Sequence, residues 1–173
     1  MNNKLSMKIR IKIAVLAFIA LISCSGTEPF KSFPPEALAQ QVTEITGESV
    51  SMKDVLDKYQ GKTIVLDVWA SWCKDCITGM PKLKALQANP ESKDVVFMFL
   101  SMDKSREAWL NGISRFNVTG EHYYIGNDWK APFNKAIGLD WIPRYMVIGK
   151  DGSITLFKAT KADDQAILDA IKE

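Results

Sequence analysis

Two cysteines, Cys73 and Cys76, are the residues of this chain whose type and spacing point most directly to chemistry. They are separated by Lys74 and Asp75, and they follow an apolar run, Ile64–Val68. Two thiols at this spacing can form a disulfide reversibly, and the thiolate of one can attack disulfides in other molecules. The pattern therefore predicts a dithiol redox centre.

A structural disulfide and half of a zinc site are the alternatives for this pair. Structural zinc usually has four Cys or His ligands. Besides the pair, the chain has only one further cysteine, Cys24, and a single histidine, His122, for which we expect a structural role. The redox interpretation is favoured, and no metal is expected.

The residues around the pair indicate how it is positioned. Ile64–Val68 is β-branched and apolar, which is typical of a strand buried on both faces. Cys73 would then lie at the end of this strand, where a helix begins, and the free N–H groups and dipole of a helix N-terminus favour a thiolate. Cys76, one turn later, is placed to resolve a mixed disulfide on Cys73. Lys74 favours the thiolate and Asp75 opposes it.

The segment 64–81 resembles thioredoxin-like proteins, and the lead-in before it resembles the TlpA/ResA-type, membrane-tethered members. The matching residues are Asp67, six residues before Cys73, and then Trp69, Ala70, Trp72 and Pro81. The resemblance implies an α/β thioredoxin-like fold, in which a central mixed β-sheet is flanked by helices in a single domain.

The same resemblance implies further site residues. Asp67 matches a buried acid that takes the proton of the resolving thiol, and burial would raise its pKa; the alternative is a strand-edge acid satisfied by solvent. Ile142-Pro143 resembles the cis-proline loop, in which the backbone of Ile142 pairs with substrate; the alternative is an ordinary proline at a strand start. Trp72 and Lys74 are also expected to contact substrate.

Two departures from the family pattern concern partner choice and redox potential rather than the reaction. Lys74-Asp75 replaces the common Gly-Pro dipeptide, and Arg144 replaces the threonine that usually follows the proline. Trp141, like Trp72, is expected either to form an apolar platform at the site or to pack in the core. Trp109, Trp129 and Phe133 are expected in the core.

The N-terminus has the pattern of an export signal. Basic residues precede an apolar run, Ile13–Ile22, that is too short to span a bilayer. Leu21-Ile22-Ser23-Cys24 resembles the lipobox of bacterial lipoproteins, which implies acylation of Cys24; a conventional signal peptide is the alternative. We expect a lipoprotein signal peptide at 1–23, a tether at 24–35 and the thioredoxin-like domain at 36–173.

The remaining pattern predicts alternating strands and helices. Glu36–Ile45 could form a short helix or a strand. Further expectations are a hairpin at Glu44–Val50, helices capped by Ser51, by Asp103, by Asn127 or Asp128 and by Asp163 or Asp164, strands at Val95–Leu100 and His122–Ile125, and a hairpin joining Arg144–Ile148 to Ser153–Phe157.

The net charge of +2 includes four basic residues and no acid within the first 23 residues, so nucleic acid is not expected as a partner. We expect an extracytoplasmic, lipid-anchored monomer of the bacterial cell envelope that reduces protein disulfides, receives electrons from an envelope donor and needs no organic cofactor. The alternatives are a thiol peroxidase, weakened by Ala70 where such enzymes carry threonine, and a binding module with an inert disulfide.

Overall fold

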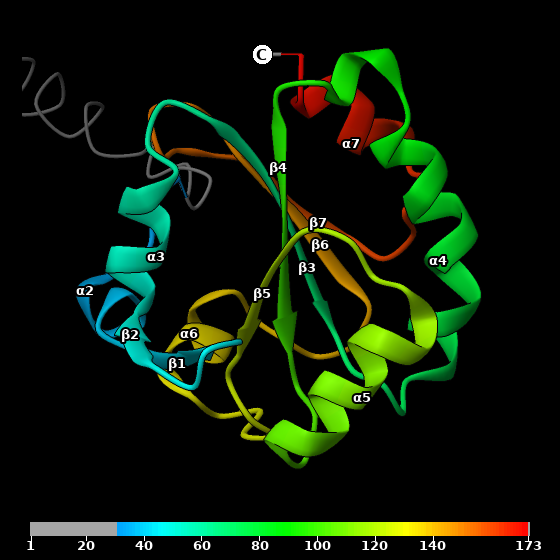
Figure 1. The fold of residues 1–173 in the computed structure, drawn as a ribbon. Coiled ribbons are helices and arrows are strands. Elements are labelled where there is room, and N and C mark those ends of the chain that lie inside the picture. Colours follow the sequence, from blue (N-terminus) through cyan, green and yellow to red (C-terminus); the bar gives the residue numbers. More distant parts are fainter. Residues whose placement is uncertain (1–30, 173) are drawn as a thin grey trace, which may run out of the picture.

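The computed structural model describes residues 31–172, which fold around one mixed β-sheet (Figure 1). Its seven strands lie in the order β2-β1-β5-β4-β3-β6-β7. Strands β3, β4 and β5 are parallel to one another, and the remaining pairs are antiparallel. This confirms the predicted fold class. The strands are β1 (Gln41–Glu44), β2 (Ser49–Ser51), β3 (Thr63–Trp69), β4 (Val95–Ser101), β5 (Glu121–Tyr124), β6 (Arg144–Ile148) and β7 (Ile154–Ala159).

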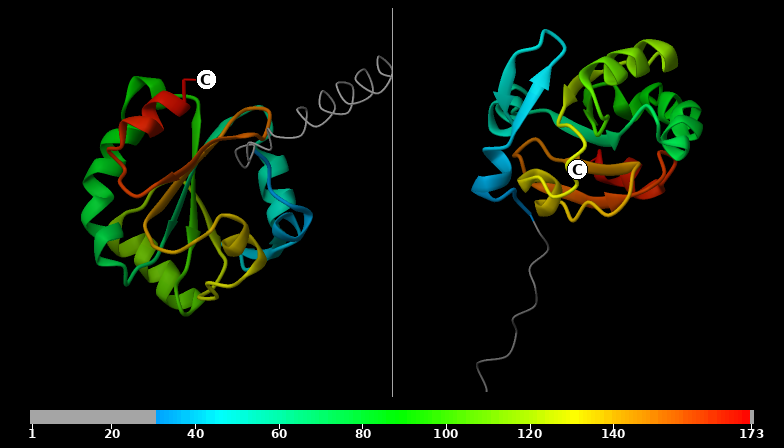
Figure 2. Two further views of the ribbon diagram at one scale, coloured as in Figure 1. Left: turned by 180° about the vertical axis from the view of Figure 1, so that it is seen from behind. Right: turned by 90° about the horizontal axis from the view of Figure 1, so that it is seen from below.

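The helices lie on both sides of this sheet. Figures 1 and 2 show α7 beside α4, whereas α2, α3 and α6 gather at the opposite edge of the molecule. Among the described residues, no helix is both long and apolar enough to cross a membrane. The helices are α2 (Pro35–Leu38), α3 (Met52–Lys58), α4 (Lys74–Gln87), α5 (Arg106–Phe116), α6 (Pro132–Ala136) and α7 (Gln165–Ala170), with a short 3₁₀ turn at Pro90–Ser92.

The core is built around β3, in which all seven residues are buried. Its neighbour β4 is buried over its last five residues, and β6 is buried throughout. Apolar side chains fit both faces of these strands because helices cover the sheet on each side. Strands β3 and β4 run parallel and in register, Trp69 beside Ser101, so the loops that follow them meet at one end of the sheet.

Helix starts agree with the sequence in part. Ser51 accepts a hydrogen bond from the Asp54 backbone N–H and caps α3, as predicted. Two predicted caps are wrong. Helix α5 is capped by Ser105 instead of Asp103, and α6 begins at Pro132, several residues after Asp128. A proline at the first helical position has no N–H to satisfy there, which explains the later start of α6.

The N-terminal segment 24–35, expected to be a tether, lies partly outside the described residues. Its described part contacts the domain. Phe33 is buried and stacks on Phe133 of α6, with the ring centroids 5.1 Å apart, and the backbone N–H of Ile154 donates to the carbonyl oxygen of Lys31. Glu36–Ile45, expected as a short helix or a strand, contains both: most of α2 and then all of β1. The signal peptide and Cys24 lie outside the described residues.

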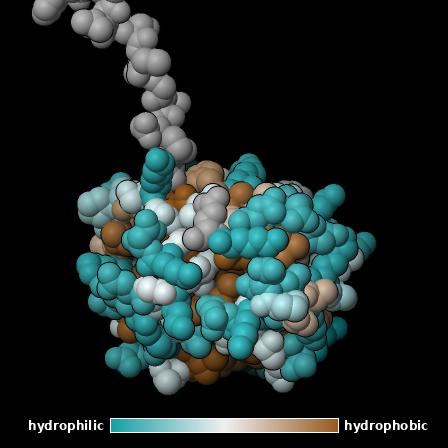
Figure 3. Space-filling model, turned by 90° about the horizontal axis from the view of Figure 1, so that it is seen from above, coloured by the Kyte–Doolittle hydropathy of each residue, from teal (hydrophilic) through white to brown (hydrophobic). Residues whose placement is uncertain are grey.

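The surface differs between the two ends of β3 and β4. Figure 3 views the end at which these strands begin, where hydrophilic side chains dominate and hydrophobic areas are small. Two of the largest exposed hydrophobic side chains in the described part of the chain, Trp72 and Trp141, belong instead to the loops where β3 ends and β6 begins. Two large apolar side chains therefore stand exposed close to the cysteine pair, and a third, Ile45, is exposed elsewhere in the described residues.

Candidate active site

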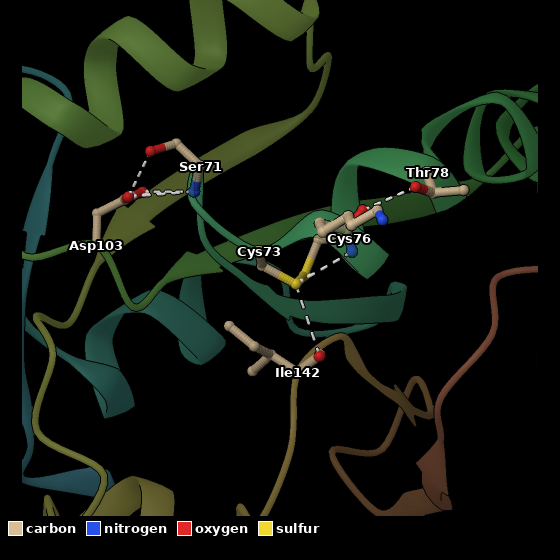
Figure 4. Close-up of a disulfide and its surroundings, with 7 residues drawn as sticks. Ser71, Cys73, Cys76, Thr78, Asp103 and Ile142 are labelled. Atoms are coloured by element: carbon tan, nitrogen blue, oxygen red, sulfur yellow. Dashed lines mark hydrogen bonds between the residues drawn. A yellow bond between two sulfur atoms is a disulfide. The ribbon is translucent and has the colours of Figure 1, made fainter.

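Cys73 and Cys76 form a disulfide at the point where β3 gives way to α4 (Figure 4). Their Cα atoms are 5.3 Å apart. Cys73 is 6% exposed and Cys76 2% exposed, so both residues of the pair are largely covered. Both predicted redox residues are therefore bonded to each other, in the oxidised form of a dithiol pair.

The N-terminus of α4 is directed at the Cys73 sulfur. Cys73 is the N-cap residue of this helix, and its Sγ accepts a hydrogen bond of 3.1 Å from the backbone N–H of Cys76. Once the disulfide is reduced, the same donor and the positive end of the helix dipole would stabilise negative charge on Cys73. Helix α4 has 14 residues and contains Pro81, as predicted.

The second predicted loop lies against the same sulfur. The Ile142–Pro143 peptide bond is cis, as expected from the resemblance. The carbonyl oxygen of Ile142 lies 3.6 Å from Cys73 Sγ (Figure 4). Residues 69 positions apart in the sequence therefore meet, and a peptide lying along Ile142 would be held next to the reacting sulfur.

Asp67 is buried in the middle of the sheet, with 2% of its surface exposed. Burial raises its pKa to about 8, and the neighbouring Tyr145 side chain has a smaller, opposite effect. One carboxylate oxygen, Oδ1, has no hydrogen-bond partner. This environment agrees with the predicted buried acid and not with a solvent-satisfied one; its part in proton transfer remains a prediction.

Arg144 does not face the site, although it directly follows Pro143. Its guanidinium is fully buried and donates to the carbonyl oxygens of Ile137, at 2.7 Å, and Gly138, at 3.1 Å. It also pairs with Asp140, whose pKa is held below its ordinary value by Lys158 foremost and by Arg144. Arginine in place of the usual threonine therefore supports the segment that leads into Trp141-Ile142-Pro143.

A positioning residue that the sequence interpretation missed is Asp103. It is fully buried, and its carboxylate accepts hydrogen bonds from the Ser71 backbone N–H, at 3.1 Å, the Ser71 hydroxyl, at 2.6 Å, and the Ser101 hydroxyl, at 2.9 Å. Trp69 and Ser101 are partners in the parallel strands β3 and β4. Ser71 lies two residues after Trp69, and Asp103 lies two residues after Ser101. This equal spacing after two parallel strands could have indicated from the sequence that Ser71 and Asp103 lie side by side. Asp103 fixes the loop that carries Cys73 (Figure 4).

An apolar groove of about 340 Å³ opens beside Cys73. We call it the tryptophan groove, because its lining includes Trp72, Trp129 and Trp141 together with Cys73 and Ile142. Trp72 is 48% exposed and Trp141 59% exposed, which favours the platform interpretation over core packing for both. Trp129, expected in the core, is only partly buried: it packs against the core and also lines the groove.

The remaining predicted residues are distributed as follows. Lys74 lies at the rim of the tryptophan groove and is exposed. Pro143 lines a second, adjoining cavity that shares Trp141 with the groove. His122 is buried, stacks on Phe99 and contacts the Val118 carbonyl oxygen through Nε2; burial lowers its pKa. These contacts agree with the structural role expected of it.

Comparisons with known proteins agree with this geometry. A family model described as thioredoxin-like matches residues 61–154. ResA thiol-disulfide oxidoreductase of Bacillus thuringiensis is 26% identical over 113 residues, which cover 65% of this chain and 61% of ResA, so the match spans about three fifths of that relative. The ResA protein of Geobacillus thermodenitrificans is 23% identical over 172 residues and is covered over 97% of its length.

Solved structures give the same result. A Bacteroides vulgatus protein, provisionally named a thiol-disulfide oxidoreductase, superposes with a TM-score of 0.62 at 32% identity, covering 81% of this chain and 88% of the other. A thiol-disulfide oxidoreductase of Bacteroides fragilis also gives a TM-score of 0.62, at 20% identity, covering 76% and 93% of the two chains. The second similarity concerns the fold alone.

Proposed function

Because the chain belongs to the thioredoxin-like family, we propose that it is a thiol–disulfide oxidoreductase whose reacting groups are Cys73 and Cys76. The observation that carries the proposal is the position of this pair. The Cys73 sulfur lies at the N-terminus of α4, 3.6 Å from the carbonyl oxygen that precedes the cis proline. One side of the sulfur is thus stabilised for nucleophilic attack, and the other is bordered by backbone on which a peptide can dock.

In the first step, the Cys73 thiolate attacks one sulfur of a substrate disulfide. A bond forms between the two sulfurs, the substrate disulfide breaks, and the other substrate sulfur leaves as a thiolate. The N–H of Cys76 and the α4 dipole favour the attacking thiolate. Ile142 holds the substrate backbone, and the exposed rings of Trp72 and Trp141 contact apolar side chains next to the substrate cysteine.

In the second step, Cys76 resolves the mixed disulfide. Its thiol loses a proton to Asp67, the resulting thiolate attacks the Cys73 sulfur, and the second substrate sulfur leaves as a thiolate. An Asp67 pKa of about 8 lies close to the ordinary thiol value of about 8.5, so the proton passes between groups of similar basicity. The substrate gains two electrons, and the enzyme is left with the Cys73–Cys76 disulfide.

We further propose that the protein works outside the cytoplasm, anchored by lipid at Cys24, and that it reduces protein disulfides. The lipobox-like sequence before Cys24 supports the anchor, and the names of the ResA relatives support the reaction type. A reductase must be re-reduced after each cycle, so the proposal includes an envelope electron donor that attacks the Cys73–Cys76 disulfide.

The thiol peroxidase alternative has weaker support. Such enzymes carry a threonine hydroxyl three residues before the nucleophile and an arginine that binds peroxide. Here that position is Ala70, which is fully buried, and Arg144 donates to backbone carbonyls. The chain therefore lacks the threonine hydroxyl at this position, and Arg144 is engaged by backbone carbonyl oxygens and does not favour peroxide binding.

Thiol titration tests the proposal against the binding module with an inert disulfide. The full-length protein is first equilibrated with a mild thiol buffer and then given a small disulfide, oxidised glutathione. We expect the buffer to release two thiols and oxidised glutathione to remove them again. The variant with both Cys73→Ser and Cys76→Ser is the matched control and corrects for Cys24. A disulfide that does not respond to the thiol buffer would reject the enzyme in favour of the binding module.

A further inference from the structure

Asp67 needs a route by which its proton reaches solvent. In the proposed second step it receives a proton from Cys76, and it must lose that proton before the next cycle. Its side chain is almost fully buried within β3, a strand that is buried along its whole length. The Oδ1 atom has no hydrogen-bond partner, so the carboxyl group has spare capacity to hold a proton.

Tyr145 is the polar side chain that links Asp67 to the surface. The two residues face each other directly across β3 and β6, so their side chains project from the same face of the sheet. The Tyr145 side chain lowers the pKa of Asp67 across this pair, and Tyr145 itself is only 1% exposed. Tyr145 also lines the second cavity, of about 370 Å³, between α4 and the segment that precedes α7; we call it the tyrosine cavity.

Gly79 leaves this cavity open at the tyrosine hydroxyl. A Cβ atom added at Gly79 would lie 3.9 Å from the Tyr145 hydroxyl oxygen, in van der Waals contact. Because glycine has no side chain, the space next to the hydroxyl stays clear, and Gly79 and Thr78 both line the cavity. A water molecule that enters the tyrosine cavity can therefore approach the hydroxyl that contacts Asp67.

We propose that Tyr145 is a positioning residue through which Asp67 exchanges its proton with water in the tyrosine cavity. The inference rests on the proposed function. The protonated carboxyl group donates to the tyrosine oxygen while the tyrosine hydroxyl proton passes to water, and rotation of the hydroxyl restores the starting arrangement. One proton leaves Asp67 and one proton enters solvent, and no electrons move.

The charges around the cavity suit this relay. Asp75 and Lys82 face it from α4, and Lys161 and Asp163 face it from the segment before α7. Lys82 and Asp163 form an ion pair of 2.6 Å, so they largely cancel. Burial foremost, and then Asp67, raise the pKa of Tyr145 above its ordinary value. Tyrosine therefore stays protonated, as a relay group must, and does not act as a base.

The test is Tyr145→Phe, which removes the hydroxyl and keeps the ring. The Tyr145 hydroxyl lowers the pKa of Asp67, so its removal should move that pKa upward. Because Asp67 must lose its proton before each new cycle, we also expect the multiple-turnover rate to fall by about tenfold or more; general acid–base steps are worth roughly 10²–10⁴ in rate. The carboxyl pKa is read by isotope-edited infrared or NMR titration, and the rate by release of the second substrate thiol across the neutral pH range.

Two further variants separate the relay from a packing effect. Tyr59→Phe is the matched control, because Tyr59 also donates its hydroxyl to a carboxylate, Glu121, outside the site; it should leave the Asp67 pKa unchanged. Gly79→Ala places a methyl group in contact with the Tyr145 hydroxyl and should slow repeated turnover with the protein still folded. In an Asp67→Asn background, Tyr145→Phe should have no further effect on the rate.

Failure of this inference can be told apart from failure of the proposed function. If wild type exchanges no disulfides, the proposed function fails, and the Asp67 pKa in Tyr145→Phe still decides whether the contact exists. An unchanged Asp67 pKa in that variant would overturn the inference. So would an equal slowing by Tyr145→Phe with and without the Asp67 carboxyl group.

Discussion

Two buried carboxylates near the cysteines have opposite surroundings, and this difference separates their roles. Asp103 accepts hydrogen bonds from Ser71 and Ser101 on both of its oxygens. Asp67 has an oxygen without a partner and a pKa raised by burial. A carboxylate saturated with donors is suited to hold a loop in place, whereas one that lacks donors is suited to take up a proton.

Asp67→Asn should change how stability depends on pH. The folded-state pKa, about 8, lies above the ordinary value of 3.8, so the contribution of this group is fully present below the unfolded value and is lost as pH rises through about 8. Each pKa unit corresponds to about 1.4 kcal/mol. Urea unfolding of the oxidised protein over this pH range should show wild type losing stability that the variant retains.

The same substitution should remove the Asp67-dependent part of the pH–rate profile of thiol release, because asparagine keeps the shape and cannot accept the proton. If the stability difference between wild type and variant is the same at acid and alkaline pH, Asp67 does not carry the raised pKa. An unchanged pH–rate profile would reject its role in proton transfer.

For individual residues, short sequence motifs predicted the functional roles better than residue types alone did. The cysteine pair and the cis proline were predictable because each belongs to a short motif with its own signal. The roles of Arg144, Asp103 and Tyr145 were not, since each depends on a partner far away in the sequence or on the opposite strand. An arginine next to a proline does not reveal that its charge is turned inward toward the carbonyl oxygens of residues 137 and 138.

Among the elements, α5 approaches the loop before Cys73 very closely. A Cβ atom on Gly112 would lie 2.5 Å from Cβ of Ser71, closer than two carbon atoms can pack. Ser71 cannot move aside easily, because its backbone and hydroxyl are both bonded to Asp103. Glycine at this position lets α5 support the cysteine loop directly.

Gly112→Ala should therefore destabilise the protein, by about 1–3 kcal/mol for an overpacked site, although alanine is the better helix former. Gly79→Ala is the matched control, because it lies in α4, makes only ordinary contacts and should gain up to about 1 kcal/mol from helix propensity. Urea unfolding measures both free energies. Equal stability changes in the two variants would show that the close approach at Ser71 costs nothing.

The elements themselves were largely predictable, and the errors have a common cause. Strands β3, β4 and β6 have continuous apolar runs, and the hairpin between β6 and β7 has its Asp-Gly turn. The predicted start of α5 is wrong because Asp103, although its residue type often caps helices, accepts hydrogen bonds from Ser71 and Ser101 instead. Trp129 was assigned to the core by helical spacing, yet it precedes the helix and lines the tryptophan groove.

For the whole molecule, the domain extends toward the N-terminus beyond the predicted boundary at residue 36. Phe33 packs into the core and Lys31 is bonded to Ile154. If Cys24 is acylated as proposed, fewer residues than the 12 of the segment 24–35 separate the lipid from the folded domain. Ile154 pairs with Ile148, which pairs with Ile64 near the start of β3, so the chain joins the domain at the end of the sheet opposite Cys73.

Cys24→Ala tests the anchor. Without the acylated thiol, the protein should move from the membrane fraction to the soluble fraction of envelope extracts, with the redox domain intact. Immunoblotting of both fractions measures the distribution, and Ser25→Ala is the matched control. Recovery of the Cys24→Ala protein with membranes, at the wild-type level, would reject the lipoprotein interpretation.

The most direct test of the central claim is trapping of the mixed disulfide. In Cys76→Ser, the resolving thiol is gone, so Cys73 should stay bonded to its protein substrates. Non-reducing gels of membrane extracts should show adducts that dithiothreitol dissolves and that disappear when Cys73 is also replaced by serine. Adducts in Cys73→Ser but not in Cys76→Ser would reverse the two roles. If neither variant forms adducts and the wild-type pair exchanges with no small disulfide, the account of this protein as a thiol–disulfide oxidoreductase is contradicted.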